Sequence, residues 1–263
     1  MESTFWYKQT ADQPLFPDML WSKPENKQHA GKLLIVGGNL HGFAAVGEAY
    51  RQATKTGAGV VKILLPNVLQ KTVGMILDNT AFAPSNKSGS FSRPALAEWL
   101  SLSAWADSVL IAGDLGRNSE TAVVLESFAN KYAGQLVLTK DAADYFAHQP
   151  GIILQRTDTL LVLSLAQLQK MCLKTKWPEP ILFSMTIQRL VQVLHEMTRA
   201  FSCVIVVEHN GLFFVAYDGK VSTTKHDTSI NVWRVKTAAH AAVWQLQNPG
   251  QPFEAITTAM YEI

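Results

Sequence analysis

The sequence predicts an α/β fold with a mostly parallel central sheet and an antiparallel hairpin near its C-terminal end. Residues 31–63 have the pattern of a strand, a glycine turn, a helix and a second strand, which is a βαβ unit and requires parallel pairing. The same order of strand, glycine turn and helix returns at residues 108–132. Asn210-Gly211 and Asp218-Gly219 separate short apolar runs near the C-terminus, and such dipeptides are typical of hairpin turns.

Apolar runs bounded by turn residues predict buried strands, and apolar residues at helical spacing predict amphipathic helices. A helix is expected to begin at an N-cap or at a proline in its first turn, so we place one N-cap at Ser119 and one helix start near Pro94. In chain order the pattern predicts strand 33–36, helix 44–55, strand 60–65, helix 67–75, strand 81–84, helix 94–105, strand 108–112, helix 119–132, strand 135–139, short apolar segments at 151–154 and 159–163, helix 166–173, helix 181–198, strand 203–207, strand 212–217, a strand around Val221, and helices 228–245 and 252–261.

Domain organisation divides the chain into an N-terminal arm, residues 1–28, and a single α/β domain, residues 29–263. The arm carries three prolines among aromatic residues, which favours an extended segment packed by its rings over a regular element. Such an arm is also suited to covering a neighbouring subunit, and we expect a homo-oligomer.

Composition excludes several classes of partner. Lys and Arg number 23 against 21 Asp and Glu, and no basic run is interleaved with aromatic residues, so nucleic acid is not expected as a partner. No apolar run reaches the ~18 residues that span a bilayer, and the N-terminus lacks the pattern of a signal peptide, which predicts a cytoplasmic protein without membrane attachment. Cys172 and Cys203 lie in apolar surroundings and are interpreted as buried thiols.

The glycine turn after the first buried strand is a candidate ligand site. Glycines there let a ligand approach the backbone, and the following helix offers free N–H groups at the positive end of its dipole. We therefore expect a phosphate or dinucleotide near residues 37–45. The spacing is GGxxxG rather than GxGxxG, and the alternative is a tight βα turn that binds nothing.

Four motifs, in order and at matching separations, resemble the ribokinase-like superfamily and, within it, the ADP/ATP-dependent NAD(P)H-hydrate dehydratase family, also called the YjeF C-terminal domain. The motifs are GKLLIVGGN with TGAGVV, IAGDLGR, LTKDAADYF and the PFEA segment at residues 252–255. The resemblance covers nearly the whole chain from His29 and implies a three-layer αβα fold with a mostly parallel sheet.

The resemblance also implies an activity and a site. The family phosphorylates the hydroxyl of hydrated NAD(P)H, called NAD(P)HX, with ATP or ADP and then eliminates phosphate, and Mg²⁺ is a candidate companion of the nucleotide. No separate metal site is expected. By the resemblance, the substrate-binding positions are Gly38, Ala45, Gly116 and Ser164, the nucleotide-binding positions are Glu208, His209, Asn210 and Ile230, and the catalytic position is Asn231.

Several of these residues depart from the family pattern. Thr228-Ser229-Ile230-Asn231 stands where the family has GTGD, and an amide at Asn231 lacks the basicity of a carboxylate. Glu208-His209-Asn210 replaces a lysine-glycine-alanine loop, and Ser164 replaces a histidine. In IAGDLGR, Asp114 adds a negative charge where a phosphate is expected.

These departures favour a catalytically impaired pseudoenzyme that retains nucleotide or dinucleotide binding. The first alternative is an active dehydratase or small-molecule kinase that has rebuilt its site. A replacement base or ligand would then come from polar residues at the strand ends: Asp114, Asp141, Asp144, Glu208, His209, His226 and Asp227. The second alternative is a non-catalytic oligomerisation or interaction protein, indicated by seven tryptophans and the aromatic arm.

Overall fold

The computed structural model describes residues 4–10, 12–73, 79–225 and 233–263, and within these residues ten strands form a single sheet. The strands are β1 (Trp6–Gln9), β2 (Lys32–Gly37), β3 (Val60–Pro66), β4 (Thr80–Ala83), β5 (Ser108–Gly113), β6 (Gln135–Thr139), β7 (Thr159–Leu163), β8 (Val204–His209), β9 (Leu212–Tyr217) and β10 (Lys220–Lys225). Their order across the sheet is β1-β10-β9-β8-β7-β6-β5-β2-β3-β4.

The pairing of these strands confirms the predicted sheet. Strand β9 runs antiparallel to both β8 and β10, and every other neighbouring pair is parallel. Both hairpin turns place their two central residues in the left-handed region, with φ values of 51° at Asn210 and 47° at Asp218. Asn and Asp followed by Gly tolerate this conformation better than other dipeptides, which is why the turns could be located from the sequence.

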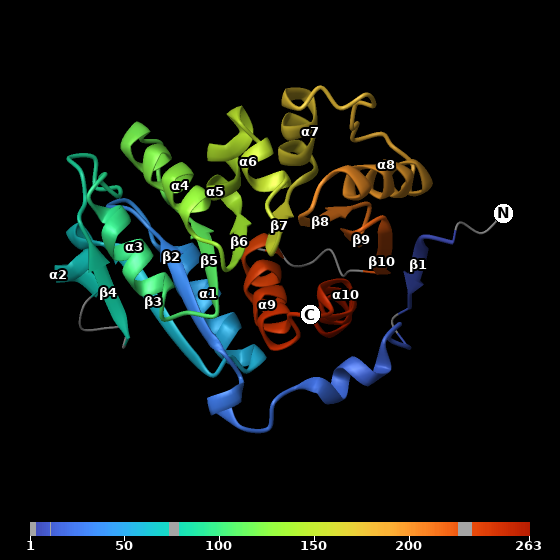
Figure 1. Cartoon of the computed structure of the whole chain (residues 1–263), viewed down its shortest axis with the longest axis horizontal. Coiled ribbons are helices and arrows are strands. Elements are labelled where there is room, and N and C mark those ends of the chain that lie inside the picture. The colour runs from blue at the N-terminus through green and yellow to red at the C-terminus, as the bar shows by residue number, and fades with distance from the viewer. Residues whose placement is uncertain (1–3, 11, 74–78, 226–232) are drawn as a thin grey trace.

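Helices cover both faces of the sheet, giving the predicted three-layer ribokinase-like arrangement (Figure 1). One face carries α3 to α8, and the other carries α1, α9 and α10. The helices are α1 (Ala44–Thr56), α2 (Gln70–Val73), α3 (Ala95–Ser103), α4 (Ser119–Lys131), α5 (Lys140–Tyr145), α6 (Gly151–Leu154), α7 (Leu165–Lys174), α8 (Ile187–Ala200), α9 (Trp233–Gln247) and α10 (Pro252–Glu262), with short 3-10 helices η1 (Pro17–Ser22), η2 (Lys27–His29), η3 (Asn67–Leu69) and η4 (Phe146–His148).

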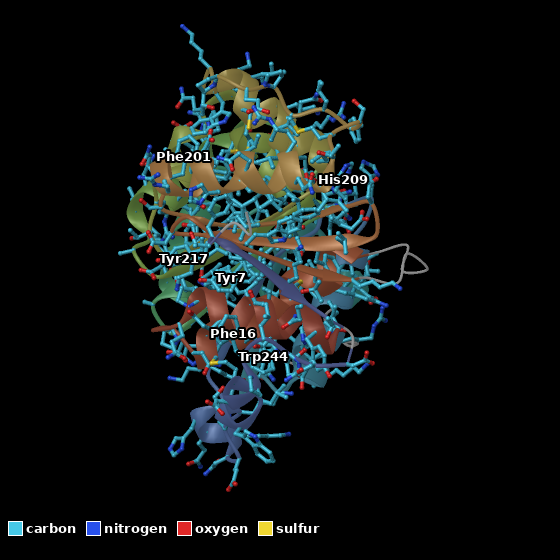
Figure 2. The ribbon with its side chains drawn as sticks, turned by 90° about the vertical axis from the view of Figure 1, so that its right-hand side faces the viewer. Tyr7, Phe16, Phe201, His209, Tyr217 and Trp244 are labelled. Atoms are coloured by element: carbon cyan, nitrogen blue, oxygen red, sulfur yellow. The ribbon has the colours of Figure 1, made fainter. Side chains whose placement is uncertain are left out.

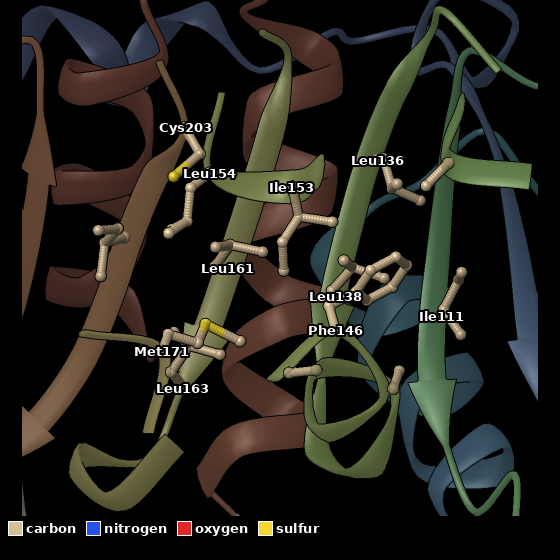
Figure 3. Close-up of a cluster of buried hydrophobic side chains, with 14 of the residues drawn as sticks. Ile111, Leu136, Leu138, Phe146, Ile153, Leu154, Leu161, Leu163, Met171 and Cys203 are labelled. Atoms are coloured by element: carbon tan, nitrogen blue, oxygen red, sulfur yellow. The ribbon is translucent and has the colours of Figure 1, made fainter. Parts of the chain in front are cut away.

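The core consists of two apolar layers separated by the sheet. In the layer under α4 to α8, Leu138, Phe146 and Leu161 belong to one buried cluster, as Figure 3 shows. Cys172 and Cys203 are free thiols in this layer, and burial raises the pKa of both to about 12, in agreement with inert core cysteines. Strand residues alternate between the two layers, so each strand in the middle of the sheet is apolar on both faces.

The N-terminal arm differs from the expectation that it lacks regular structure. Trp6–Gln9 forms edge strand β1, which pairs in parallel with β10. Gln9 donates from Nε2 to the Thr224 hydroxyl and the Thr257 carbonyl, at 2.9 and 2.8 Å. Tyr7 and Phe16 both pack edge-on against the ring of Phe253 in α10, on the side of the molecule shown in Figure 2.

The arm therefore covers the sheet edge of its own chain, because the unpaired backbone groups of β10 offer a better partner than solvent. The domain boundary at residue 28 and the expected homo-oligomer stay predictions.

Several elements differ from the sequence prediction: residues 151–154 form helix α6, residues 67–73 form η3 and α2, and other bounds shift by a few residues. Two of the differences have a capping residue as their cause. Helix α8 begins at Ile187 rather than Ile181, because Thr186 caps it by accepting a hydrogen bond from the Arg189 N–H. The N-cap of α4 is Asn118 rather than Ser119, since the Asn118 side chain accepts from the N–H groups of Glu120 and Thr121. Within the described ranges, no helix is both long enough and apolar enough to cross a membrane.

Candidate functional site

The carboxyl ends of β2, β5, β6 and β7 meet at one edge of the sheet, where the predicted substrate positions lie. Gly38 follows β2 with φ of 82°, and its N–H donates to the carbonyl of Gly113 at the end of β5, at 3.0 Å. A Cβ at Gly38 would lie 3.1 Å from both Leu65 and Phe43. The glycine turn is therefore dictated by packing and a positive φ, whatever ligand it contacts.

The N-terminus of α1 is occupied by a carboxylate of the chain itself. The N–H of Ala45 donates to Oδ2 of Asp114 at 2.7 Å, and Ala45 is almost fully buried. The Asp114 side chain is 20% exposed to solvent. The side chain of the N-cap residue Phe43 makes no hydrogen bond to the first turn of α1. Asp114 therefore supplies the anion that the helix dipole favours there. The position where the sequence predicts a phosphate thus holds a carboxylate.

Lys140 completes this arrangement from the end of β6. Its Nζ donates to Oδ1 of Asp114 at 2.6 Å, so the Asp114 carboxylate bridges a helix N–H and an ammonium group. The Lys140 side chain is 31% exposed. The two charges neutralise each other, which removes the net attraction that this corner would otherwise exert on an anion.

Asp141 lies beside this pair. Its Oδ2 accepts from the N–H of Leu115 at 2.8 Å. Burial raises the pKa of the Asp141 carboxyl, and the charge of Asp114 adds to that rise, whereas the Leu115 amide and Lys140 oppose it. Gly113 makes room for the group, because a Cβ there would lie 2.7 Å from Oδ1 of Asp141 and 2.9 Å from Cβ of Lys140.

A chain of hydrogen bonds extends from Lys140 to the end of β7. Ser164 and Gln167 form a capping box at the start of α7, so Ser164 is engaged in holding its helix. Nε2 of Gln167 donates to the Lys140 carbonyl at 2.6 Å, and Nη1 of Arg234 donates to Oε1 of Gln167 at 3.2 Å. The structure thus joins Ala45 and Ser164, two predicted substrate positions, through Asp114, Lys140 and Gln167.

Gly116 lies at the outer side of the same edge. It has φ of 73°, and its carbonyl accepts a hydrogen bond from the hydroxyl of Tyr145. The same hydroxyl accepts from the N–H of Asn118 at 3.0 Å. Burial raises the pKa of Tyr145. The turn that carries Gly116 is therefore fixed by α5.

Three of the four predicted nucleotide positions, Glu208, His209 and Asn210, lie at the end of β8 and in the turn that follows it. Oε1 of Glu208 accepts from the N–H of Gly211 at 3.3 Å. His209 is buried, and its Nε2 lies 3.2 Å from the Met185 carbonyl and 3.0 Å from Nδ2 of Asn210. No hydrogen bond among the described residues connects these three side chains with Asp114 or Lys140. Their role in nucleotide binding stays a prediction.

The remaining candidates fall into two groups. Ile230, Asn231, His226 and Asp227 lie outside the described residues, so the predicted catalytic position has no structural account. Asp144 is exposed on α5. Within the described part of the chain, no three His, Cys, Asp or Glu side chains group closely enough to hold a metal ion.

The sequence prediction left Lys140 as either solvated or ligand-binding, placed Gln167 in the segment that carries Ser164 without giving it a role, and did not include Arg234. A signal existed for each of them: Lys140 directly follows a buried strand, Gln167 is the third residue after the Ser164 N-cap, and Arg234 lies in the first turn of a helix at the same sheet edge. What the sequence did not show is that these side chains bind one another.

The fold is shared with solved structures of ribokinase-like proteins. A ribokinase-like superfamily protein from Enterococcus faecalis superposes with a TM-score of 0.71 over 99% of this chain and 87% of its own, at 14% sequence identity.

An ADP/ATP-dependent NAD(P)H-hydrate dehydratase from Bacillus subtilis, co-crystallized with ATP and Mg²⁺, gives a TM-score of 0.58 over 90% of this chain and 79% of its own, at 13% identity. A phosphomethylpyrimidine kinase from Clostridium difficile gives 0.56 over 87% and 96%, at 9% identity. No protein-family model and no curated protein sequence matches the chain. At these identities the likeness establishes the ribokinase-like fold.

Proposed function

We propose that this protein is a non-catalytic ribokinase-like protein, related to the NAD(P)H-hydrate dehydratases, that retains binding of a nucleotide or dinucleotide. The likeness in fold to a dehydratase co-crystallized with ATP and Mg²⁺ supports the binding half of the proposal. The contact of the Asp114 carboxylate with the Ala45 N–H and the Lys140 ammonium carries the non-catalytic half. A carboxylate at this place repels a phosphate and occupies the amide that would hold it.

The residues at the other candidate positions support the same proposal. Glu208 places a second negative charge where the related dehydratases are expected to have a lysine, and Ser164 stands where they are expected to have a histidine. Asn231 cannot accept a proton at neutral pH. Loss of a general base and of an anion-stabilising group costs about 10² to 10⁴ in rate each, so several losses together remove turnover by the ancestral reaction.

Two assays test the two halves of the proposal separately. Incubation with NADHX and either ADP or ATP should give no conversion above the uncatalysed rate, and measurable turnover would refute the non-catalytic half. Thermal unfolding with ATP, ADP, AMP, NADH and NADPH should show stabilisation by at least one of them, since a ligand at 100 times its dissociation constant adds about 2.7 kcal/mol. Unchanged unfolding temperatures with all five would refute the binding half.

A rebuilt active site is the second candidate, and Asp141 is the observation that favours it. A half-buried carboxyl with a raised pKa beside a lysine has the properties of a general base. If the protein turns over NADHX or phosphorylates a small hydroxylated molecule, Asp141→Asn should abolish that activity. Activity that survives this change would assign the base to another residue.

A further inference from the structure

A cavity of about 720 Å³ opens between the start of α4, helix α5 with η4, and the last turns of α7. Its volume lies within the range of roughly 300 to 1,000 Å³ that small-molecule sites occupy. Figure 1 shows the three helices close together on one side of the sheet. The cavity shares Gly116, Asn118, Asp141 and Tyr145 with the candidate functional site, whereas the proposed function does not involve its residues Arg117, Lys170, Leu173 and Lys174.

The wall of this cavity is partly apolar. Ala122, Ala147 and the ring of Tyr145 line it, and Leu173 adds a side chain that is 66% exposed. An exposed leucine at a cavity wall loses contact with water when an apolar group binds, which is a favourable change of about 25 cal/mol for each Å² covered. A ligand with an apolar or aromatic body fits this wall.

Cations surround the same cavity. Lys170 and Lys174 lie one turn apart on α7, and Arg117 precedes α4. In the part of the chain that the structure describes, none of these three side chains has a carboxylate within ion-pair distance. A bound anion is attracted by each of these three positive charges.

Two carboxylates, Asp141 and Asp144, also line the cavity, so three cations face two carboxylates and the formal net charge of these five side chains is +1. Asp141 is turned to the candidate functional site, where it accepts from the Leu115 N–H. Asp144 lies on the exposed side of α5. The remaining lining is polar or basic and includes Asn118, Ser119 and His148.

We infer that this cavity binds a small anionic molecule with an apolar or aromatic body, held by Arg117, Lys170 and Lys174 and covered by Leu173. The inference does not depend on the proposed function. Helix α7 contributes only Gln167 and the Ser164 cap to the hydrogen bonds that join Asp114, Lys140 and Gln167, which we call the Asp114 network. The anionic group is a phosphate, sulfonate or carboxylate, all of which accept charge-assisted hydrogen bonds from lysine and arginine.

Isothermal titration calorimetry with 1-naphthyl phosphate tests the inference on the whole chain. We expect one site, and we expect 1-naphthol and inorganic phosphate to bind at least about tenfold more weakly, since each carries only half of the recognised chemistry. Repeating the titration with 1-naphthalenesulfonate and 1-naphthoate identifies which anionic group binds best. Absence of binding by all three aromatic anions would overturn the inference.

The variant Lys170→Glu/Lys174→Glu should weaken binding about tenfold or more, because two charge-assisted contacts are lost. A matched control, Lys27→Glu/Lys71→Glu, changes two exposed lysines outside the cavity by the same total charge and should bind as the unchanged protein does. Leu173→Ser, which alters no charge, should also weaken binding and gives an independent reading. Equal affinity in the lysine pair variant and its control would overturn the inference. It would also be overturned if replacing Asp114 abolished binding while the lysine pair variant kept full affinity.

Discussion

The two ends of helix α1 are held by opposite kinds of polar contact. At its start, the Ala45 N–H bonds the charged Asp114 carboxylate, which is itself paired with Lys140 near solvent. At its end, the Thr56 hydroxyl lies 2.8 Å from Nδ1 of His240, which is buried between α1 and α9. The first end is at the carboxyl edge of the sheet, where open α/β sheets bind their ligands, and the second is at the opposite edge.

The contact at the start of α1 lies in the candidate functional site, whereas the contact at its end only holds the structure together. Burial lowers the pKa of His240 and so keeps its ring neutral near pH 7. Asp114 and Lys140 instead form an ion pair whose side chains are 20% and 31% exposed, so a competing ion can reach either of them. We therefore expect changes at His240 to alter stability alone, and changes at Asp114 to alter binding more than stability.

The largest expected effect is a loss of stability on acidification caused by His240. Burial lowers its pKa from 6.5 to about 4, and the positive charge of Lys23 adds to the decrease. The unfolded chain therefore binds a proton more readily than the folded one below pH 6.5, so the free energy of unfolding falls as pH falls. One pKa unit corresponds to about 1.36 kcal/mol, so about 3 kcal/mol should be lost between pH 6.5 and 4.

Urea unfolding at a series of pH values measures this effect. His240→Gln removes the titrating group at similar size, and its curve should lack the part of the pH dependence that His240 contributes. The same pH dependence in the variant would assign it to other groups.

A smaller loss of stability is expected when the packing beneath the Asp114 network is disturbed. In Gly113→Ala the new methyl group meets Asp141 and Lys140 at under 3 Å, and the residue must keep φ of 106°. We expect a loss of about 2 kcal/mol, since strained backbone conformations cost about 1 to 3 kcal/mol each.

Gly47→Ala is the matched control for this change. Its Cβ would meet no atom within 4 Å, and the residue lies within α1, so the variant should gain about 0.5 to 1 kcal/mol. Chemical denaturation of both variants tests the pair. A loss in Gly47→Ala as large as that in Gly113→Ala would refute the packing argument.

The smallest expected effect concerns the ion pair between Asp114 and Lys140. Lys140→Met keeps most of the aliphatic stem and removes the charge, and about 0.2 to 1 kcal/mol of coupling with Asp114→Asn should appear in a double-mutant cycle. The pKa of Asp141 should also rise further in Lys140→Met, because the Lys140 charge lowers it. Carboxyl NMR titration measures that shift, and an unchanged pKa would show that Lys140 does not act on Asp141.

Much of the fold could be predicted from sequence because local signals agreed with the global arrangement. The glycine turns after β2 and β5 and the hairpin dipeptides each favour one backbone conformation. Strand β1 could not be predicted, because Trp6–Gln9 has no strong strand pattern and forms only where β10 offers an open edge. Its existence depends on a contact with residues more than 200 positions away.

The location of the predicted substrate positions in the fold could be predicted from the sequence, but the hydrogen bonds around them could not, and their role in substrate binding stays a prediction. Gly38, Ala45, Gly116 and Ser164 do lie at the carboxyl edge of the sheet. The hydrogen bonds of Asp114 to Ala45 and Lys140 depend on positive φ values, 57° at Asp114 and 50° at Lys140. Positive φ is uncommon for residues other than glycine, so the sequence pattern does not predict it at these two positions. The sequence showed the negative charge of Asp114 at the turn, but it did not show that Lys140 pairs with it.

Whether Asp114 closes an anion site is the central claim, and binding of pyrophosphate and NADPH to Asp114→Gly tests it most directly. Glycine tolerates φ of 57° without a side chain, so this variant frees the Ala45 N–H and the Lys140 ammonium while keeping the turn. Asp114→Asn is the control, since its amide oxygen still accepts from Ala45. We predict that calorimetry shows at least about tenfold tighter binding of one of these anions to Asp114→Gly than to the unchanged protein. Equal affinities in a folded Asp114→Gly protein would contradict the account.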